Sequence, residues 1–123
     1  MGRFSVRVRV KAPGKRIAAT VSALVDTGAA VSVIPAATLR RLGIKPYWRR
    51  RFVLANGERS ERDVGVAVFR WNGSEGASEV VFGERGDKPL LGALTLESLA
   101  LGVNPRRARL EPTELMLLWE SRD

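Results

Sequence analysis

The stretch Ala23-Leu24-Val25-Asp26-Thr27-Gly28-Ala29-Ala30-Val31 places a three-residue polar centre between two apolar flanks. Asp26 is the only acidic residue before position 58, and no lysine or arginine lies within nine positions on either side of it. A carboxylate in apolar surroundings costs several kcal/mol unless it is hydrogen-bonded, paired or protonated. The chain therefore holds Asp26 here for a structural or a chemical reason.

The segments before Asp26 are strand-like. Residues 3–11 alternate strictly between polar and apolar side chains, which predicts a half-buried strand. A turn signal follows at residues 12–15, and Ile17 to Val25 then runs nearly all apolar or small, as is typical of a strand covered on both faces. The two segments therefore predict a hairpin that leads into Asp26.

The segment after Gly28 predicts a short strand and a helix. The strand is expected over the apolar residues 29–34. Pro35 is expected to open the helix and Gly43 to close it, which is the usual punctuation of a helix. Leu39 and Leu42 would form the inner face of this helix, and Arg40 and Arg41 the outer face.

Two hairpins and a second helix are predicted further on. Asn56-Gly57 and Asn72-Gly73 each lie between strand-like residues, and Asn-Gly is the strongest short hairpin signal. A short helix is predicted from Thr95 to Leu101, ended by Gly102. Residues 105–112 are expected to form a charged, proline-bounded stretch, and residues 115–119 a final apolar strand.

The whole chain has the composition of one globular domain. Its 123 residues are 45% hydrophobic and 28% charged, which is ordinary for a domain that buries its own core. The absence of cysteine and histidine excludes disulfides, thiol chemistry, the usual zinc sites and every triad that uses an imidazole. Carboxylates, hydroxyls and amines remain for chemistry, and no metal or cofactor is expected.

Charge and hydropathy bear on location and partners. Residues 1–7 carry charges where a signal peptide needs an apolar stretch, and no run approaches the length of a membrane span, so we expect a cytoplasmic protein without membrane contact. The net charge of +8 is uneven, because residues 1–62 hold 14 basic and 3 acidic side chains. Such a surface could contact nucleic acid, although arginine-rich outer faces of strands and helices are commoner than binding sites.

A loose internal repeat relates the two halves of the chain. The order of hairpin, Val25 to Gly28, short helix and glycine is echoed by hairpin, Leu90-Leu91-Gly92, short helix and glycine. Together with the flanking strands, these motifs resemble the retropepsin-like aspartic proteases, a single-domain family that includes the retroviral proteases. The resemblance covers most of residues 4–103.

The resemblance implies a fold. It is all-β with one or two short helices, a closed barrel or sandwich of hairpins with an internal pseudo-repeat, in one domain over residues 1–123 that acts as a twofold homodimer. Ala23 to Ala29 looks like the active-site motif of the family, and Leu90-Leu91-Gly92 like its second-half motif. The hairpin at about residues 50–66 looks like the flap that closes over substrate.

The chemistry gives a separate reason for a dimer. Peptide hydrolysis by two carboxyl groups needs one that is ionised, to take a proton from water, and one that is neutral, to donate to the scissile carbonyl. Two carboxyls that share a proton supply both states. The chain offers one such aspartate, so a twofold axis would have to bring Asp26 to its own copy. The predicted function is therefore a homodimeric aspartic endopeptidase that cleaves peptides or unfolded proteins.

The resemblance also implies roles for single residues. The expected catalytic residues are Asp26, Thr27 and Gly28, with Thr27 bonding across the dimer and Gly28 admitting substrate backbone. The expected substrate-binding residues are Ala29, Ala30, Asn56, Gly57 and Leu91. Alanines at positions 30 and 93 stand where many retroviral members carry charged residues, so the apolar strand at about residues 114–120 is the expected dimer contact instead.

Other interpretations stay open. Asp26 could be a turn residue with Thr27 and Gly28 as its natural neighbours, and Leu90-Leu91-Gly92 could be core residues before a tight bend. A retropepsin fold could also bind peptides or partners without cleaving them. Finally, a small basic β-protein could bind nucleic acid through residues 3–16 and 40–51, although no ribonucleoprotein-type aromatic motif is present.

Overall fold

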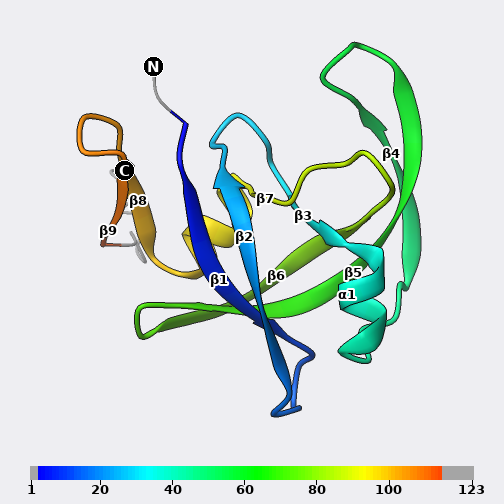
Figure 1. Ribbon diagram of the computed structural model, residues 1–123, viewed down its shortest axis with the longest axis horizontal. Helices are drawn as coiled ribbons and strands as arrows, with labels where there is room; N and C mark the ends of the chain where they lie inside the picture. The colour runs from blue at the N-terminus through cyan, green and yellow to red at the C-terminus, as the bar shows by residue number, and fades with distance from the viewer. Residues whose placement is uncertain (1–2, 115–123) are drawn as a thin grey trace, which may run out of the picture.

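The computed structural model describes residues 3–114 as a mostly β molecule with two short helices (Figure 1), which confirms the expected fold class. The strands are β1 (Ser5–Lys11), β2 (Ala18–Val25), β3 (Ser32–Pro35), β4 (Trp48–Val53), β5 (Arg59–Trp71), β6 (Ser74–Gly83), β7 (Leu90–Leu91), β8 (Leu101–Asn104) and β9 (Arg109–Pro112). The helices are α1 (Ala36–Arg41) and α2 (Ala93–Ser98).

The larger sheet closes into a ring. Its strand order is β1-β2-β7-β3-β6-β5-β4, and β1 also pairs with β5, so that β4 alone extends outward from the ring. The core fills the inside of the ring, and its largest fully buried side chains include Phe69, Phe82, Ile34, Leu39 and Leu91. The expected closed barrel of hairpins is therefore present.

The first hairpin forms as predicted, but β2 is less buried than expected. In β1 the alternation places Val8 and Val10 in the core with no exposed surface. In β2 the inward side chain Ala23 is buried, whereas Thr20 and Ser22 are exposed. The expectation of a strand covered on both faces is wrong. Side chains of β2 alternate between the core and the solvent, as in an ordinary half-buried strand, and this alternation is hard to see in the sequence because most of the residues are small.

Helix α1 follows the punctuation in its sequence. It begins directly after Pro35, and Gly43, with a φ of 82°, follows its C-cap residue Leu42. Leu39 and Leu42 are buried, and the two arginines of the last turn are exposed. The predicted inner and outer faces of this helix are confirmed.

Both Asn-Gly pairs form hairpin turns, of two different kinds. Asn72 and Gly73 both have positive φ, 47° and 87°, as in a type I′ turn between β5 and β6. Between β4 and β5 only Gly57 has a positive φ, 86°. The Leu54 N–H donates to the Glu58 carbonyl at 2.7 Å and the Leu54 carbonyl accepts from the Gly57 N–H at 2.9 Å, which is a three-residue loop with a bulge at the glycine.

The second helix differs from its prediction at both ends. Helix α2 spans Ala93–Ser98, and Ala100 takes the left-handed conformation with a φ of 57° where the helix ends. The predictions that the helix reaches Leu101 and that Gly102 ends it are wrong, because residues 101–104 form β8 and pair with β9. Pairing between these strands outweighs the helix preference of the leucine-rich segment.

The charged, proline-bounded residues 105–112 include strand β9, which was not predicted. The predicted strand at about residues 114–120, with its possible role in dimerisation, lies outside the described residues. Neither helix in residues 3–114 has the length and apolar character that crossing a bilayer requires.

Candidate active site

Asp26 begins the loop that joins β2 to β3. Its Oδ1 accepts a hydrogen bond from the Gly28 N–H at 2.9 Å, and its carbonyl accepts from the Ala29 N–H at 3.2 Å. An aspartate that bonds the backbone two residues on is a common turn device. The Asp-Thr-Gly sequence therefore folds into a tight turn in which the carboxylate and the glycine amide lie together.

The second-half motif, Leu90-Leu91-Gly92, lies directly against this loop. β2 pairs in parallel with β7, with Leu24 beside Leu90, and the Asp26 N–H donates to the Leu91 carbonyl at 3.0 Å. The first amides of α2 point at the loop as well, since Ala93 donates to the Ala29 carbonyl at 2.8 Å. Amides of a first helical turn have no partner within their helix, so the loop supplies one. The second half of the pseudo-repeat thus holds the loop of the first half in place.

A chain of three hydroxyl groups, two of them fully buried, supports the contact between this loop and the second-half motif. Ser32 Oγ accepts from the Gly92 N–H at 2.9 Å and lies 2.5 Å from Thr95 Oγ1, which lies 2.8 Å from Ser78 Oγ. Ser32 and Thr95 have no exposed surface. This network was not predicted from the sequence, although a lone serine within the apolar run Val31-Ser32-Val33 was a signal for it.

A groove of about 750 Å³ runs past Asp26 and under the β4–β5 hairpin. In Figure 1 the loop after β2 and the tip of this hairpin lie at the same end of the molecule. The walls of the groove are mainly apolar and are formed by Val31, Val33, Phe52, Val53, Leu54, Val81, Leu90 and Leu94. The lining also includes charged residues, which are Arg3, Asp26, Arg50, Arg62, Glu79, Asp87 and Lys88. A concave surface that is mainly apolar, with polar groups at set places, is the usual form of a binding site.

The other carboxylates of the groove are paired with arginines. Glu79 accepts from Arg50 at 3.1 Å, and Asp87 accepts from Arg62 through two bonds of 2.8 and 3.1 Å. The hydrogen bond from Arg62 lowers the pKa of the Asp87 carboxyl, and burial opposes this shift only partly. Within residues 3–114, Asp26 takes part in no ion pair, in contrast to these two carboxylates.

The structure brings four of the expected site residues to the groove and leaves Thr27 exposed beside them. The four are Asp26, Gly28, Ala29 and Ala30. Because the turn is tight, a Cβ on Gly28 would lie 3.2 Å from Asp26 Oδ1. Four of the five residues from Asp26 to Ala30 therefore line one groove, and Thr27 lies beside it.

The remaining expected residues lie elsewhere. Asn56 and Gly57 are exposed at the tip of the β4–β5 hairpin, and the lining comes instead from residues 52–55 of this hairpin. Leu91 is fully buried and does not line the groove, whereas Leu90 and Leu94 do. Side chains alternate between the faces of a strand, so one of two adjacent leucines must point to the core.

Comparison with known proteins places this geometry in context. A family model described as aspartyl protease matches residues 6–104. The fold is similar to the solution structure of simian foamy virus (mac) protease, with a TM-score of 0.51 and 21% identity over 75% of this chain and 92% of that chain. No match was found among curated proteins.

A second solved structure is similar over more of the chain. It is the crystal structure of prototype foamy virus protease–reverse transcriptase in its native form, with a TM-score of 0.50 and 16% identity. The similarity covers 94% of this chain and 13% of that much longer chain. At such identities both likenesses concern the fold alone.

Proposed function

Since this chain belongs to the family of retropepsin-like aspartyl proteases, we propose that it is an aspartic endopeptidase that works as a symmetric homodimer. The observation that carries the proposal is the placement of Asp26. Its carboxylate lies in a tight turn that lines a mainly apolar groove, and no cation in residues 3–114 pairs with it. A carboxyl without a fixed counter-ion is free to take its protonation state from a second carboxyl nearby.

The need for a second chain follows from the charges of the groove. Carboxylate-pair hydrolysis requires two carboxyls that share one proton. Glu79 and Asp87 also line the groove, but Arg50 and Arg62 bind them as anions. The partner of Asp26 would therefore be Asp26 of a second copy, brought close by a twofold axis. Thr27, exposed beside it, would bond across that axis and fix the two loops to each other.

In the proposed reaction, a water molecule lies between the two Asp26 carboxyls. The ionised carboxyl takes a proton from the water as its oxygen attacks the scissile carbonyl carbon, and the neutral carboxyl donates its proton to the carbonyl oxygen. In the second step, the carboxyl that took the proton from water donates it to the amide nitrogen, and the other, now ionised, carboxyl takes a proton from one diol hydroxyl. The C–N bond breaks, and the products are a carboxylic acid and an amine. No bond forms between enzyme and substrate.

The surroundings of Asp26 suit an extended peptide. Gly28, Ala29 and Ala30 have small side chains or none, so a substrate backbone can approach the carboxylates closely. The β4–β5 hairpin, with Asn56 and Gly57 at its tip, would close over the peptide as a flap and exclude bulk water. A peptide bound between flap and loop would run as an added strand, with its apolar side chains in the groove.

The proposal is tested by comparing two substitutions of similar size. Asp26→Asn removes the proposed acid and base, and should lower cleavage of an unfolded protein at acid pH by roughly a thousandfold, the scale of general acid–base catalysis. Asp63→Asn is the control, because Asp63 pairs with Arg49 at 2.7 Å and does not line the groove. This control should keep most of the activity.

The outcome also separates cleavage from simple binding. If Asp26→Asn cleaves as fast as the unchanged chain, the assignment of Asp26 is wrong. If the unchanged chain binds extended peptides in the groove but cleaves none from acid to neutral pH, the fold serves binding alone.

A further inference from the structure

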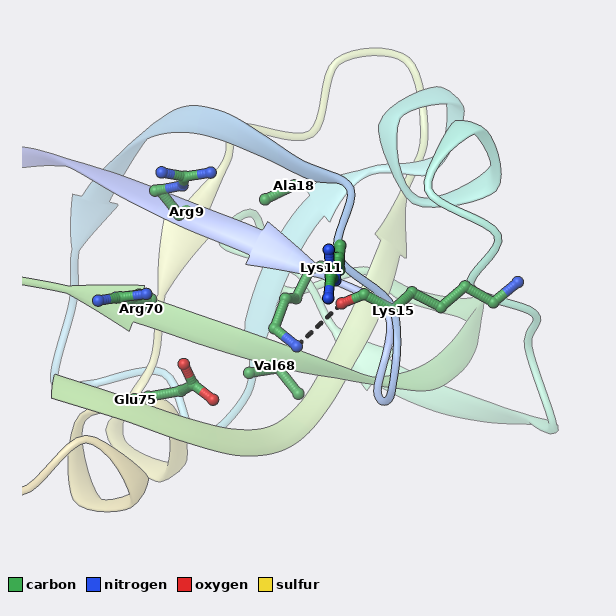
Figure 2. A pocket seen from close by; sticks show the side chains of 8 residues that line it. Arg9, Lys11, Lys15, Ala18, Val68, Arg70 and Glu75 are labelled. Carbon is green, nitrogen blue, oxygen red and sulfur yellow. Dashed lines mark hydrogen bonds between the residues drawn. The ribbon is translucent and has the colours of Figure 1, made fainter. Parts of the chain in front are cut away.

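A second pocket lies at the end of the molecule opposite to the groove. It has a volume of about 210 Å³ and forms between β1, the β1–β2 turn, β5 and β6 (Figure 2). The residues that line it are Arg9, Lys11, Lys15, Arg16, Ala18, Val68, Arg70 and Glu75. Five of these eight side chains are basic and one is acidic, so the pocket is strongly cationic.

The most unusual residue pair of this pocket lies on the seam, the pairing of β1 with β5 that closes the ring. Arg9 of β1 stands directly opposite Arg70 of β5. Like charges at directly opposed positions of two strands destabilise a sheet. Glu75, opposite Arg70 on the other side, is the one carboxylate of the pocket. The seam therefore carries two guanidinium groups for one carboxylate.

The other cations of the pocket add to this excess. Lys11 Nζ donates to the Lys15 carbonyl at 3.0 Å, and this carbonyl provides no full negative charge. Within residues 3–114, none of the basic side chains of the pocket takes part in an ion pair. In Figure 2 the ammonium group of Lys15 points away, whereas Arg9, Arg70 and Glu75 lie on three neighbouring strands.

We propose that this pocket and the adjoining outer face of β1 bind the phosphate backbone of a single-stranded nucleic acid. Guanidinium forks match phosphate oxygens in two parallel hydrogen bonds, and a bound phosphate would relieve the repulsion between Arg9 and Arg70. The pocket is smaller than the usual site for a whole small molecule, which favours a phosphate group over a larger ligand.

The row of cations on β1 extends the site beyond the pocket. Arg7 lies on the same exposed face as Arg9 and Lys11. Side chains two residues apart on a strand are about 6.8 Å apart, which is close to the spacing of successive phosphates in an extended strand. A nucleic acid carries a charge at every repeat, whereas a peptide would need an acidic residue at every second position.

Binding at this site would be independent of base sequence. No aromatic side chain lines the pocket, so the bases have no stacking platform there, and phosphate contacts carry no sequence information. The site is also separate from the proposed protease site. The Asp26→Asn chain should therefore bind as well as the unchanged chain, and failure of one proposal leaves the other intact.

The test uses the whole chain carrying Asp26→Asn, so that it does not digest itself. Fluorescence anisotropy of labelled single-stranded DNA and RNA should show affinity that falls steeply between about 50 mM and about 200 mM salt. Adding Arg9→Gln and Arg70→Gln together should weaken binding at least about tenfold at the lower salt and reduce the slope of log affinity against log salt by about 1.4.

Two further variants separate the site from general charge and from loss of folding. Arg106→Gln with Arg107→Gln removes the same charge from the exposed turn between β8 and β9, and should change affinity less than about twofold. Glu75→Gln removes the carboxylate of the pocket and should strengthen binding, a gain that a misfolded protein cannot produce.

Several results would overturn the proposal. They are an affinity that does not depend on salt, equal weakening by the two arginine pairs, and no gain from Glu75→Gln. Competition by inorganic phosphate or by polyglutamate, at charge concentrations equal to that of the oligonucleotide, would assign the pocket to small anions or to acidic peptides instead.

Discussion

Gly92 lies where the second-half motif passes so close to the loop after Asp26 that no side chain fits between them. A Cβ at this position would lie 2.6 Å from the Val31 carbonyl oxygen and 2.9 Å from that of Ala29. Backbone atoms cannot yield as the end of a flexible side chain can. The glycine is therefore required by close approach, not by an unusual backbone angle.

Gly92→Ala should consequently lower the free energy of unfolding by about 1–3 kcal/mol, the usual cost of overpacking. Gly102→Ala is the matched control, because a Cβ there would meet its nearest atom at an ordinary 3.7 Å. Urea unfolding of both variants measures the difference. Equal free energies of unfolding in the two variants would show that Gly92 and the loop lie further apart than in this structure.

Asp87 gives a prediction about pH. Its carboxyl has a lowered pKa because of the Arg62 hydrogen bond, so the folded state holds this proton less tightly than the unfolded state. The stabilisation is present above the unfolded pKa, about 3.9, and is lost as the pH falls through the folded pKa. Unfolding free energy measured from pH about 6 downward should therefore fall less in Asp87→Asn than in the unchanged chain.

Glu97→Gln is the control for this measurement, since Glu97 is exposed on α2 and makes no ion pair within residues 3–114. It should follow the acid profile of the unchanged chain. If the free energy of unfolding of Asp87→Asn falls at acid pH as steeply as that of the unchanged chain, the Asp87–Arg62 pair does not control the acid part of the stability profile.

At the scale of elements, short sequence signals predicted the turns and helix ends that are formed by neighbouring residues. The Asn-Gly pairs, Pro35 and Gly43 predicted two hairpins and a helix, and the structure has all three. The ends of α2 were not predictable in this way. The beginning of this helix depends on the Ala29 carbonyl that Ala93 bonds, which is far away in the sequence. Its end depends on the pairing of β8 with β9, a nearby hairpin whose turn lacks an Asn-Gly signal.

The candidate site divides along the same line. The turn at Asp26 is local, so the sequence identified it, whereas the placement of Leu91 depends on the register between β2 and β7. A register difference of one residue exchanges the faces of a strand. The sequence therefore identified the leucine pair but not which leucine, Leu90 or Leu91, faces the groove.

Thr95 of α2 connects the helix to strands β3 and β6 through its hydroxyl. Thr95→Val keeps the shape of the side chain but leaves Ser32 and Ser78 without this partner. We expect a loss of about 1–3 kcal/mol in unfolding free energy, the cost of unpaired buried polar groups. Thr20→Val on the exposed face of β2 should stay within about 0.5 kcal/mol of the unchanged chain. Equal effects in the two variants would mean that the hydroxyl chain contributes little.

For the whole molecule, the decisive property is whether two chains share one active site. Adding an equal amount of the Asp26→Asn chain to a fixed amount of active chain should lower the cleavage rate by about half, because mixed dimers hold one carboxylate. An equal mass of an unrelated folded protein should leave the rate unchanged. A rate insensitive to the Asp26→Asn chain would indicate a catalytic monomer.

During translation, Asp26 is synthesised early, whereas the distant residues that hydrogen-bond to its loop are synthesised late. The amide of Asp26 bonds to Leu91, and the loop carbonyls at residues 29 and 30 bond to Ala93 and Leu94, far along the chain. Contacts between residues so distant in sequence form slowly. On the ribosome, most of the chain must emerge before these partners are available. The nascent protein therefore lacks an assembled Asp26 loop during most of its translation.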